Sequence, residues 1–261
     1  MHSHHCQIPL HIQELLFQKA HQYNRSSFIS SDPISVPHIF SAKHDIEIAA
    51  FLVAAIAWGQ RKTIITNGLK IMSLMDNRPG DFILQFTEAD IRPFSKFVHR
   101  TFNFVDLEFF LFSLKNIYQQ HSGLESIFTK FYIPNQSIKD AICGFRDVFF
   151  SIPHPARSLK HVSNPVRGAA AKRINMFLRW MVRHDNAGVD FGLWKQISTA
   201  HLMCPLDVHS GRVARSLGLL QRKQDDWSAV EHLTANLRLL NPTDPILFDY
   251  ALFGIGVFEN A

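Results

Sequence analysis

The chain has 261 residues, of which 46% are hydrophobic and 19% charged, so it can bury a full core and is not a disordered chain. Lys and Arg outnumber Asp and Glu by 27 to 22, and the resulting charge of +5 suits a polyanionic partner. The longest apolar run, residues 48–58, is shorter than the roughly 20 residues that a membrane span needs, and the N-terminus lacks the apolar core of a signal peptide. We therefore expect no membrane partner.

The three cysteines, Cys6, Cys143 and Cys204, are far apart in the sequence. They form no CxxC pair, which excludes a zinc knuckle and a four-cysteine iron–sulfur cluster within one chain. Isolated thiols are typical of a reducing compartment, so the predicted location is the cytoplasm. The His- and Cys-bearing start, residues 1–6, is interpreted as a flexible tail.

The first half of the chain predicts helices separated by polar turns. Apolar residues recur at helical spacing over Leu10–Tyr23, whereas the prolines of residues 24–37 predict an extended connection. Asp45 is the expected N-cap of a helix over residues 46–58, which is apolar on every face apart from Glu47 and should be buried all round. Further helices are predicted over residues 64–75 and 137–150, and the phenylalanine-rich segment 94–118 should supply the core with Phe109, Phe110, Phe112 and Leu114.

The second half begins with a proline-bearing linker over residues 151–155 and a cluster of potential cations. These are Arg157, Lys160, His161, Arg167, Lys172 and Arg173. Helices are predicted over residues 169–182, 198–204, 207–217 and 227–240, and a last one starts at residues 243–245. Because period-two alternation is nearly absent, the predicted fold class is all-α.

Lys172 is the first candidate for chemistry. It lies in the first turn of a predicted helix, at the positive end of the helix dipole, with Arg167 and Arg173 nearby. Both effects favour the neutral amine, a nucleophile that can form a Schiff base with a sugar carbon. The alternative is an exposed lysine with a solvated head.

Asp207 is the second candidate, and it precedes a predicted helix that carries His209, Arg212 and Arg215. A helix N-cap alone would account for an aspartate at this position. In a cleft, however, a carboxylate can also accept a proton or stabilise an oxocarbenium-like sugar. The basic residues that follow could hold phosphates near the start of the helix.

Residues 205–215, P-L-D-V-H-S-G-R-V-A-R, resemble a segment of the helix-hairpin-helix DNA glycosylases of the endonuclease III superfamily. That family shows the pattern P-V-D-T-H-x-x-R-V, in which the aspartate is catalytic. Asp207, His209, Arg212 and Val213 match it, whereas Leu206 and Val208 replace a valine and a threonine.

Two further segments extend the resemblance. Residues 172–177, K-R-I-N-M-F, look like the lysine-bearing helix of the archaeal 8-oxoguanine glycosylase branch, which implies that Lys172 is the Schiff-base lysine. Residues 48–60 are similar to a buried helix whose terminal glutamine approaches DNA, so Gln60 is implied to be a wedge or gap-filling residue. Over most of its length the chain looks like a bacterial family of uncharacterised proteins within this superfamily.

The resemblance implies a single glycosylase-like domain over residues 1–261, with two helical subdomains that flank a DNA-binding cleft and a boundary near residues 151–165. The expected DNA contacts are Gln60, Arg61, Arg167, Gly168, Arg173, His209, Arg212 and Arg215. The usual hairpin, L-P-G-V-G-x-K-T-A, is not present, because residues 166–172 keep only one glycine and the lysine. The superfamily's iron–sulfur cysteines are also absent.

These features predict a DNA-repair glycosylase with an associated abasic-site lyase activity, acting as a monomer on an oxidised purine of the 8-oxoguanine type in double-stranded DNA. Lys172 and Asp207 are the predicted catalytic residues, and neither a metal nor another cofactor is expected. One alternative is a DNA-binding protein that keeps the fold without the chemistry. Another is a metal-dependent phosphohydrolase that uses the dipeptides His44-Asp45 and His184-Asp185.

Overall fold

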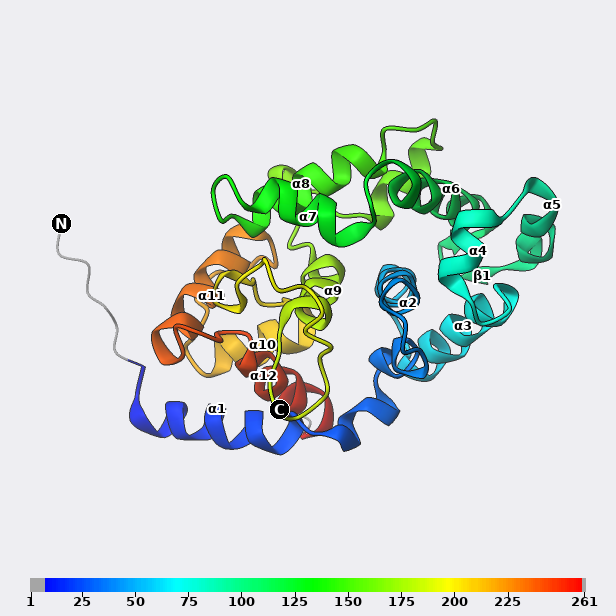
Figure 1. Cartoon of the computed structure of the whole chain (residues 1–261). Helices are drawn as coiled ribbons and strands as arrows, with labels where there is room; N and C mark the ends of the chain where they lie inside the picture. The colour runs from blue at the N-terminus through cyan, green and yellow to red at the C-terminus, as the bar shows by residue number, and fades with distance from the viewer. Residues whose placement is uncertain (1–7, 260–261) are drawn as a thin grey trace.

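The computed structural model describes residues 8–259, which are predominantly helical, so the all-α prediction is confirmed (Figure 1). The twelve α-helices within this range are α1 (Leu10–Tyr23), α2 (Lys43–Ala55), α3 (Arg61–Leu74), α4 (Pro79–Gln85), α5 (Glu88–Ile91), α6 (Phe104–Gln120), α7 (Leu124–Tyr132), α8 (Ile138–Phe149), α9 (Lys172–Val182), α10 (Val208–Ser216), α11 (Trp227–Leu240) and α12 (Leu247–Phe258). Two short strands, β1 (Val98–His99) and β2 (Phe102–Asn103), form an antiparallel pair. The predicted tail, residues 1–6, lies outside the described residues.

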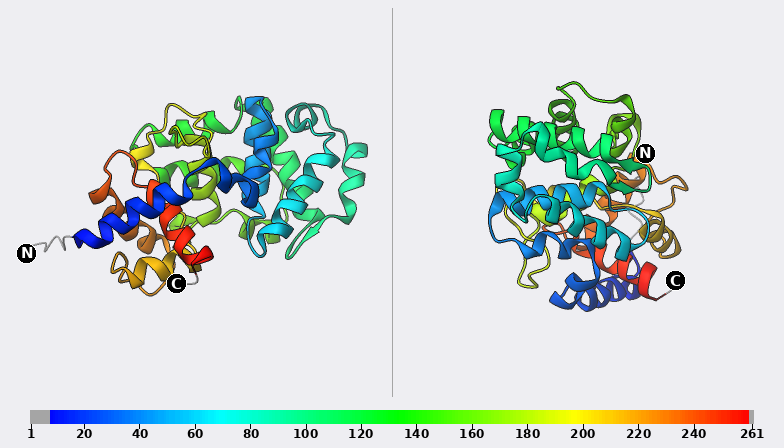
Figure 2. Two further views of the ribbon diagram at one scale, coloured as in Figure 1. Left: turned by 90° about the horizontal axis from the view of Figure 1, so that it is seen from below. Right: turned by 90° about the vertical axis from the view of Figure 1, so that its right-hand side faces the viewer.

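Helix α2 stands at the centre of the molecule (Figure 1). It packs against α9 on one side and against α3 and α4 on the other. The first and last helices, α1 and α12, lie side by side, and α12 also packs on α10 (Figure 2). Segments from both ends of the chain therefore meet on the α9 side of α2, while the predicted boundary segment, residues 151–165, connects α8 to α9.

The burial of α2 agrees with its sequence pattern. Every residue from Ile46 to Ala55 is buried. Glu47, the one charged residue among them, accepts hydrogen bonds from the Tyr118 hydroxyl at 2.8 Å and from Trp194 Nε1 at 2.7 Å. The predicted N-cap is wrong, because the helix begins at Lys43 and Asp45 lies in its first turn. The Asp45 carboxylate instead accepts a hydrogen bond from the backbone N–H of Gly80 at 2.7 Å, which ties the start of α4 to α2.

Phenylalanine rings join the central helices. The ring of Phe51 on α2 has centroid distances of 5.8, 5.4, 5.4 and 5.6 Å to Phe110, Phe145, Phe149 and Phe177, which lie on α6, α8 and α9. Phe51 stacks on Phe110 and meets the other three rings edge to face, and aromatic pairs of both kinds add to the stabilisation that burial provides. Phe51 is completely buried, so one side chain holds four helices together.

Several local predictions were wrong. Residues 26–39 form three short 3₁₀-helices in place of an extended connection, and residues 198–204 contain only a three-residue 3₁₀ turn. Phe109, Phe110 and Leu114 are buried as predicted, but Phe112 is 37% exposed because it lies on the opposite face of α6. The last helix begins at Leu247, since residues 243–246 form a turn in which the Asp244 carboxylate accepts a hydrogen bond from the N–H of Leu247.

None of the helices in the described part of the chain combines the length and the apolar character that crossing a lipid bilayer requires.

Replacing Phe51 by alanine should lower the free energy of unfolding by about 3–5 kcal/mol, because it leaves a cavity where four helices meet. Urea denaturation monitored by circular dichroism measures the change. Leu239 on α11 is 56% exposed and provides the control, since Leu239→Ala should change stability by no more than about 0.5 kcal/mol. A loss below about 1 kcal/mol in Phe51→Ala would contradict the role given to this ring.

Candidate active site

A pocket of about 520 Å³ opens where five segments converge. Its volume lies in the range of known small-molecule sites. It is lined by residues that precede α2 (Phe28, Asp32, Pro33), by the turn after α2 and the start of α3 (Ala57, Trp58, Gly59, Arg61, Ile64), by α9 (Lys172, Arg173, Met176, Arg179), by the start of α10 and the residues before it (Pro205, Asp207, Val208, His209) and by α12 (Asp249, Phe253, Val257). The pocket therefore combines aromatic walls with several charged groups.

Helical periodicity explains which residues of α9 and α12 reach the pocket. Lys172, Met176 and Arg179 are spaced at i, i+4 and i+7, so they project from one face of α9. Asp249 and Phe253 share one face of α12 for the same reason. Each of the two helices thus contributes both charged and apolar side chains to the pocket lining.

Lys172 is the first residue of α9. The turn before it is held by a hydrogen bond from the N–H of Trp227 to the Gly168 carbonyl at 2.9 Å. Gly168 has φ of +85°, a left-handed conformation that glycine adopts without strain. From this position Lys172 extends into the pocket, where its Nζ lies 3.6 Å from Asp207 Oδ2 and 3.5 Å from the sulfur of Met176.

The two carboxylate oxygens of Asp207 have separate partners. Oδ1 caps α10 by accepting hydrogen bonds from the N–H groups of His209 at 2.9 Å and Ser210 at 3.0 Å. The hydroxyl of Ser210 accepts a hydrogen bond from the N–H of Asp207 in return, which completes a capping box. The cap fixes the carboxylate so that Oδ2 faces Lys172. Both interpretations of Asp207 from the sequence, as helix cap and as pocket carboxylate, therefore apply at once.

Four of the predicted DNA contacts lie at or beside the pocket. Arg61 and His209 line it, and Gln60 is the exposed N-cap of α3 beside Arg61. Arg173 also lines it, stacks over the ring of Trp58 at 4.6 Å and donates hydrogen bonds to the carbonyls of Ala55 and Lys160. Three basic side chains therefore line the pocket, and the neutral Gln60 lies beside them.

The other four predicted contacts lie away from the pocket lining. Arg167 and Gly168 are exposed in the turn before α9. Arg212 donates a hydrogen bond to the carbonyl of Gly256, and Arg215 forms an ion pair with Asp225 at 2.6 Å. The structure therefore does not gather all eight residues at the opening, and a shared DNA-contacting role for them remains a prediction.

The sequence analysis did not identify two buried carboxyl groups in the pocket, Asp32 and Asp249. Asp249 on α12 is paired with Arg179 of α9, and burial raises the pKa of its carboxyl to about 6. Asp32 precedes a 3₁₀-helix (Pro33–Ser35) and is only 5% exposed, and burial raises its pKa as well. For Asp249 the sequence offered one signal of a buried carboxyl group, since this residue lies within the strongly apolar segment 246–258.

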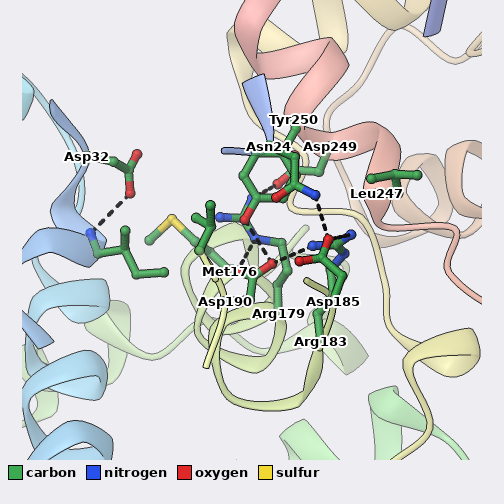
Figure 3. Close-up of polar contacts among 12 residues, drawn as sticks. Asn24, Asp32, Met176, Arg179, Arg183, Asp185, Asp190, Leu247, Asp249 and Tyr250 are labelled. Carbon is green, nitrogen blue, oxygen red and sulfur yellow. Dashed lines mark hydrogen bonds and ion pairs between the residues drawn. The ribbon is translucent and has the colours of Figure 1, made fainter. Parts of the chain in front are cut away.

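Behind the pocket, Arg179 begins a buried network of ion pairs (Figure 3). It pairs with Asp249 and also with Asp190, at 3.2 Å. Asp190 in turn pairs with Arg183 at 3.1 Å and accepts a hydrogen bond from the Tyr250 hydroxyl at 2.8 Å. Because buried charges are costly unless they are paired, this network locks α9 to α12 and fixes the floor of the pocket.

The two His-Asp dipeptides have other partners. The Asp45 carboxylate binds the N–H of Gly80, and the ring of His44 lies edge-on to Tyr118. Asp185 pairs with Arg183. Within residues 8–259, no group of three or more His, Cys, Asp or Glu side chains is arranged to hold a metal ion.

The raised pKa of Asp249 gives a pH-dependent prediction. Burial raises this pKa from 3.8 to about 6, so the folded state binds the proton more tightly than the unfolded chain does. The stabilisation that Asp249 contributes is therefore fully present below about pH 4 and is lost as the pH rises through 6. In Asp249→Asn, which keeps an acceptor for Arg179, the free energy of unfolding should fall less steeply between pH 4 and 6. Urea denaturation of both proteins between pH 4 and 6 is the test. The prediction is contradicted if the free energy of unfolding changes with pH by the same amount in Asp249→Asn as in the wild type.

The family described as "Protein of unknown function (DUF2400)" matches residues 32–258 of the chain. That range includes every residue of the pocket lining except Phe28. Neither the curated proteins nor the solved structures contain a significant match. Because the match covers most of its length, the chain belongs to the family described as "Protein of unknown function (DUF2400)".

Proposed function

We propose that this protein is a DNA base-excision glycosylase with an associated abasic-site lyase activity, and that it removes an oxidised purine of the 8-oxoguanine type. The observation that carries the proposal is the Lys172–Asp207 pair, with 3.6 Å between Nζ and Oδ2, in the wall of a pocket of about 520 Å³. The pair supplies a nucleophile and a proton acceptor side by side. The resemblance of residues 172–177 and 205–215 to the glycosylases supports the same assignment.

The pocket suits an extruded nucleotide. The carbon that reacts in a nucleoside, C1′, is inaccessible in a base-paired stack, so the nucleotide must leave the helix first. Phe28 and Phe253 offer aromatic surface inside the pocket, on which a base can stack. Arg61 and Arg173, beside Gln60, offer positive charge that attracts phosphates.

The proposed reaction uses the two side chains in sequence. Asp207 takes a proton from the Lys172 ammonium and releases it to solvent, and the carboxylate that this restores stabilises the positive charge that develops on the sugar. Neutral Lys172 attacks C1′ and the base is expelled. Ring opening then gives a Schiff base between Lys172 and C1′, which permits β-elimination and cleavage of the strand. Every step is assigned to the side chains and the substrate, and the proposed setting is the cytoplasm with the protein acting as a monomer.

The division of labour within Asp207 supports this role. A carboxylate that only capped α10 would need one oxygen for the two backbone N–H groups, and Oδ1 already accepts both. Oδ2 has no capping function and faces Lys172. The side chain of Asp207 is 25% exposed and that of Lys172 is 24% exposed. The pair is therefore partly accessible to a substrate, and it is held in place by the start of α10.

Borohydride trapping tests the proposal. Wild-type protein incubated with a duplex that carries 8-oxoguanine or an abasic site should give a covalent protein–DNA band on a denaturing gel. Lys172→Gln should abolish the band because it removes the amine. Asp207→Asn should slow its formation by about a hundredfold or more, because it removes the proton acceptor while keeping an oxygen that can cap α10.

Lys195 provides the matched control, since it is exposed and lies outside the pocket lining. Lys195→Gln removes one positive charge, as Lys172→Gln does, and should leave the band unchanged. Salt-dependent DNA binding without any band from wild-type protein would contradict the proposal. That result would favour the alternative of a non-catalytic DNA-binding protein, which the altered hairpin at residues 166–171 suggests.

A further inference from the structure

Asp32 is a buried carboxyl group that reaches the pocket from the opposite end of the chain to Asp249. It caps the 3₁₀-helix Pro33–Ser35, where one oxygen, Oδ1, accepts a hydrogen bond from the N–H of Ile34 at 3.1 Å. The residue is 5% exposed and lines the pocket. The second oxygen points away from this hydrogen bond (Figure 3), and among the described residues it has no hydrogen-bond donor. A nine-tenths buried carboxyl group therefore has one oxygen available to a ligand.

No cation within residues 8–259 neutralises Asp32 by direct contact. Arg179 pairs with Asp190 and Asp249, and Lys172 pairs with Asp207. Burial without an ion pair favours the protonated form of a carboxyl group. In agreement, burial raises the pKa of Asp32, and this effect exceeds the opposing effects of the Ile34 N–H and of the charges on Arg179, Lys172 and Arg61.

The three carboxyl groups of the pocket thus have three different environments. Asp207 is half-buried, faces Lys172 and accepts two backbone N–H groups. Asp249 is buried, and its charge is balanced by the ion pair with Arg179. Asp32 is buried and has no ion-pair partner. Where environments separate titratable groups in this way, they separate the roles of acid and base.

We propose that Asp32 is the general acid that donates a proton to the departing base. This inference rests on the proposed glycosylase function and adds a catalytic residue to it. Lys172 Nζ forms a bond to C1′ while the bond from C1′ to the base nitrogen breaks, and its electron pair moves onto the base. The base takes the proton of the Asp32 carboxyl group and leaves neutral, so Asp32 becomes a carboxylate. Asp207 accepts the proton that the alkylated Lys172 nitrogen must lose.

The position of Asp32 fits this assignment. Lys172 and Asp207 enter the pocket from the starts of α9 and α10, whereas Asp32 enters from the segment that precedes α2. The apolar side chains of Phe28, Met176 and Phe253 share the lining. Low polarity around a proton donor keeps it protonated until a substrate arrives, and the exclusion of water by a bound base strengthens this effect.

An abasic duplex separates this role from a structural one, because no base has to leave before Lys172 attacks. Asp32→Asn retains an oxygen that can accept the Ile34 N–H but removes the acidic proton. In single-turnover assays, base release from duplexes carrying 8-oxoguanine and other oxidised purines should fall by about a hundredfold or more. Borohydride trapping on the abasic duplex should stay within about twofold of wild type and shows that the variant is folded.

Asp45→Asn is the matched control. Asp45 also accepts a backbone N–H close to a helix start, but it lies outside the pocket lining, so both activities should remain at the wild-type level. Equal losses on the two substrates in Asp32→Asn would show a structural role and overturn the inference. Base release at the wild-type rate in Asp32→Asn would overturn it too. The inference would also fail if the wild-type protein formed the adduct with the abasic duplex but released no base from any of the damaged duplexes. A wild-type protein that gives no adduct on the abasic duplex would instead refute the proposed function itself.

Discussion

The packing of α9 against α2 is the constraint on which the rest of the structure depends. The two helices are held together by Phe51, whose ring contacts Phe177 on α9 and phenylalanines on α6 and α8. With α9 fixed in this way, Lys172, its first residue, lies near the turn that follows α2. At the pocket, the guanidinium of Arg173 on α9 stacks on the ring of Trp58 in that turn, which is a second contact between α9 and the end of α2. An interior with the density of an organic crystal transmits this geometry to the site with little freedom.

The charged partners of each carboxyl group in the pocket then set what that group can do. The cap on α10 leaves one oxygen of Asp207 for Lys172, and the paired Arg179 makes Asp249 part of the floor. The network of Arg179, Asp190, Arg183 and Tyr250 lies behind that floor and joins α9 to α12. Desolvation offsets much of the attraction between the charges of a buried network, so the ion pairs of this network are weak evidence of stability.

Local signals predicted the elements that depend on local interactions. Helices α1 and α11 have the predicted bounds, and Asp207 caps α10, because apolar periodicity and capping are properties of short segments. The 3₁₀-helices of residues 26–39 were missed because prolines are compatible with both a turn and an extended chain. The exposure of Phe112 depends on which face of α6 meets α8, a tertiary property that composition does not encode.

The candidate site was predictable only in part. The resemblance to the glycosylases singled out Lys172 and Asp207, and the fold brings them within 3.6 Å, although their roles remain a prediction. Asp32 and Arg179 could not be found in this way, because each looks like an ordinary polar residue within its own segment. Asp249 differs from its segment only in being a charged residue among apolar ones. These three residues become neighbours only when segments from the two ends of the chain meet α9 at the pocket.

The most direct test of the account is to locate the covalent bond. After borohydride trapping on an abasic duplex, digestion with nuclease and protease followed by mass spectrometry shows which amine carries the deoxyribose remnant. The account predicts that the modified peptide is the one containing Lys172, at the nitrogen that lies beside Asp207. A remnant on another lysine, or on the N-terminal amine, would show that the pocket described above does not hold the reacting sugar.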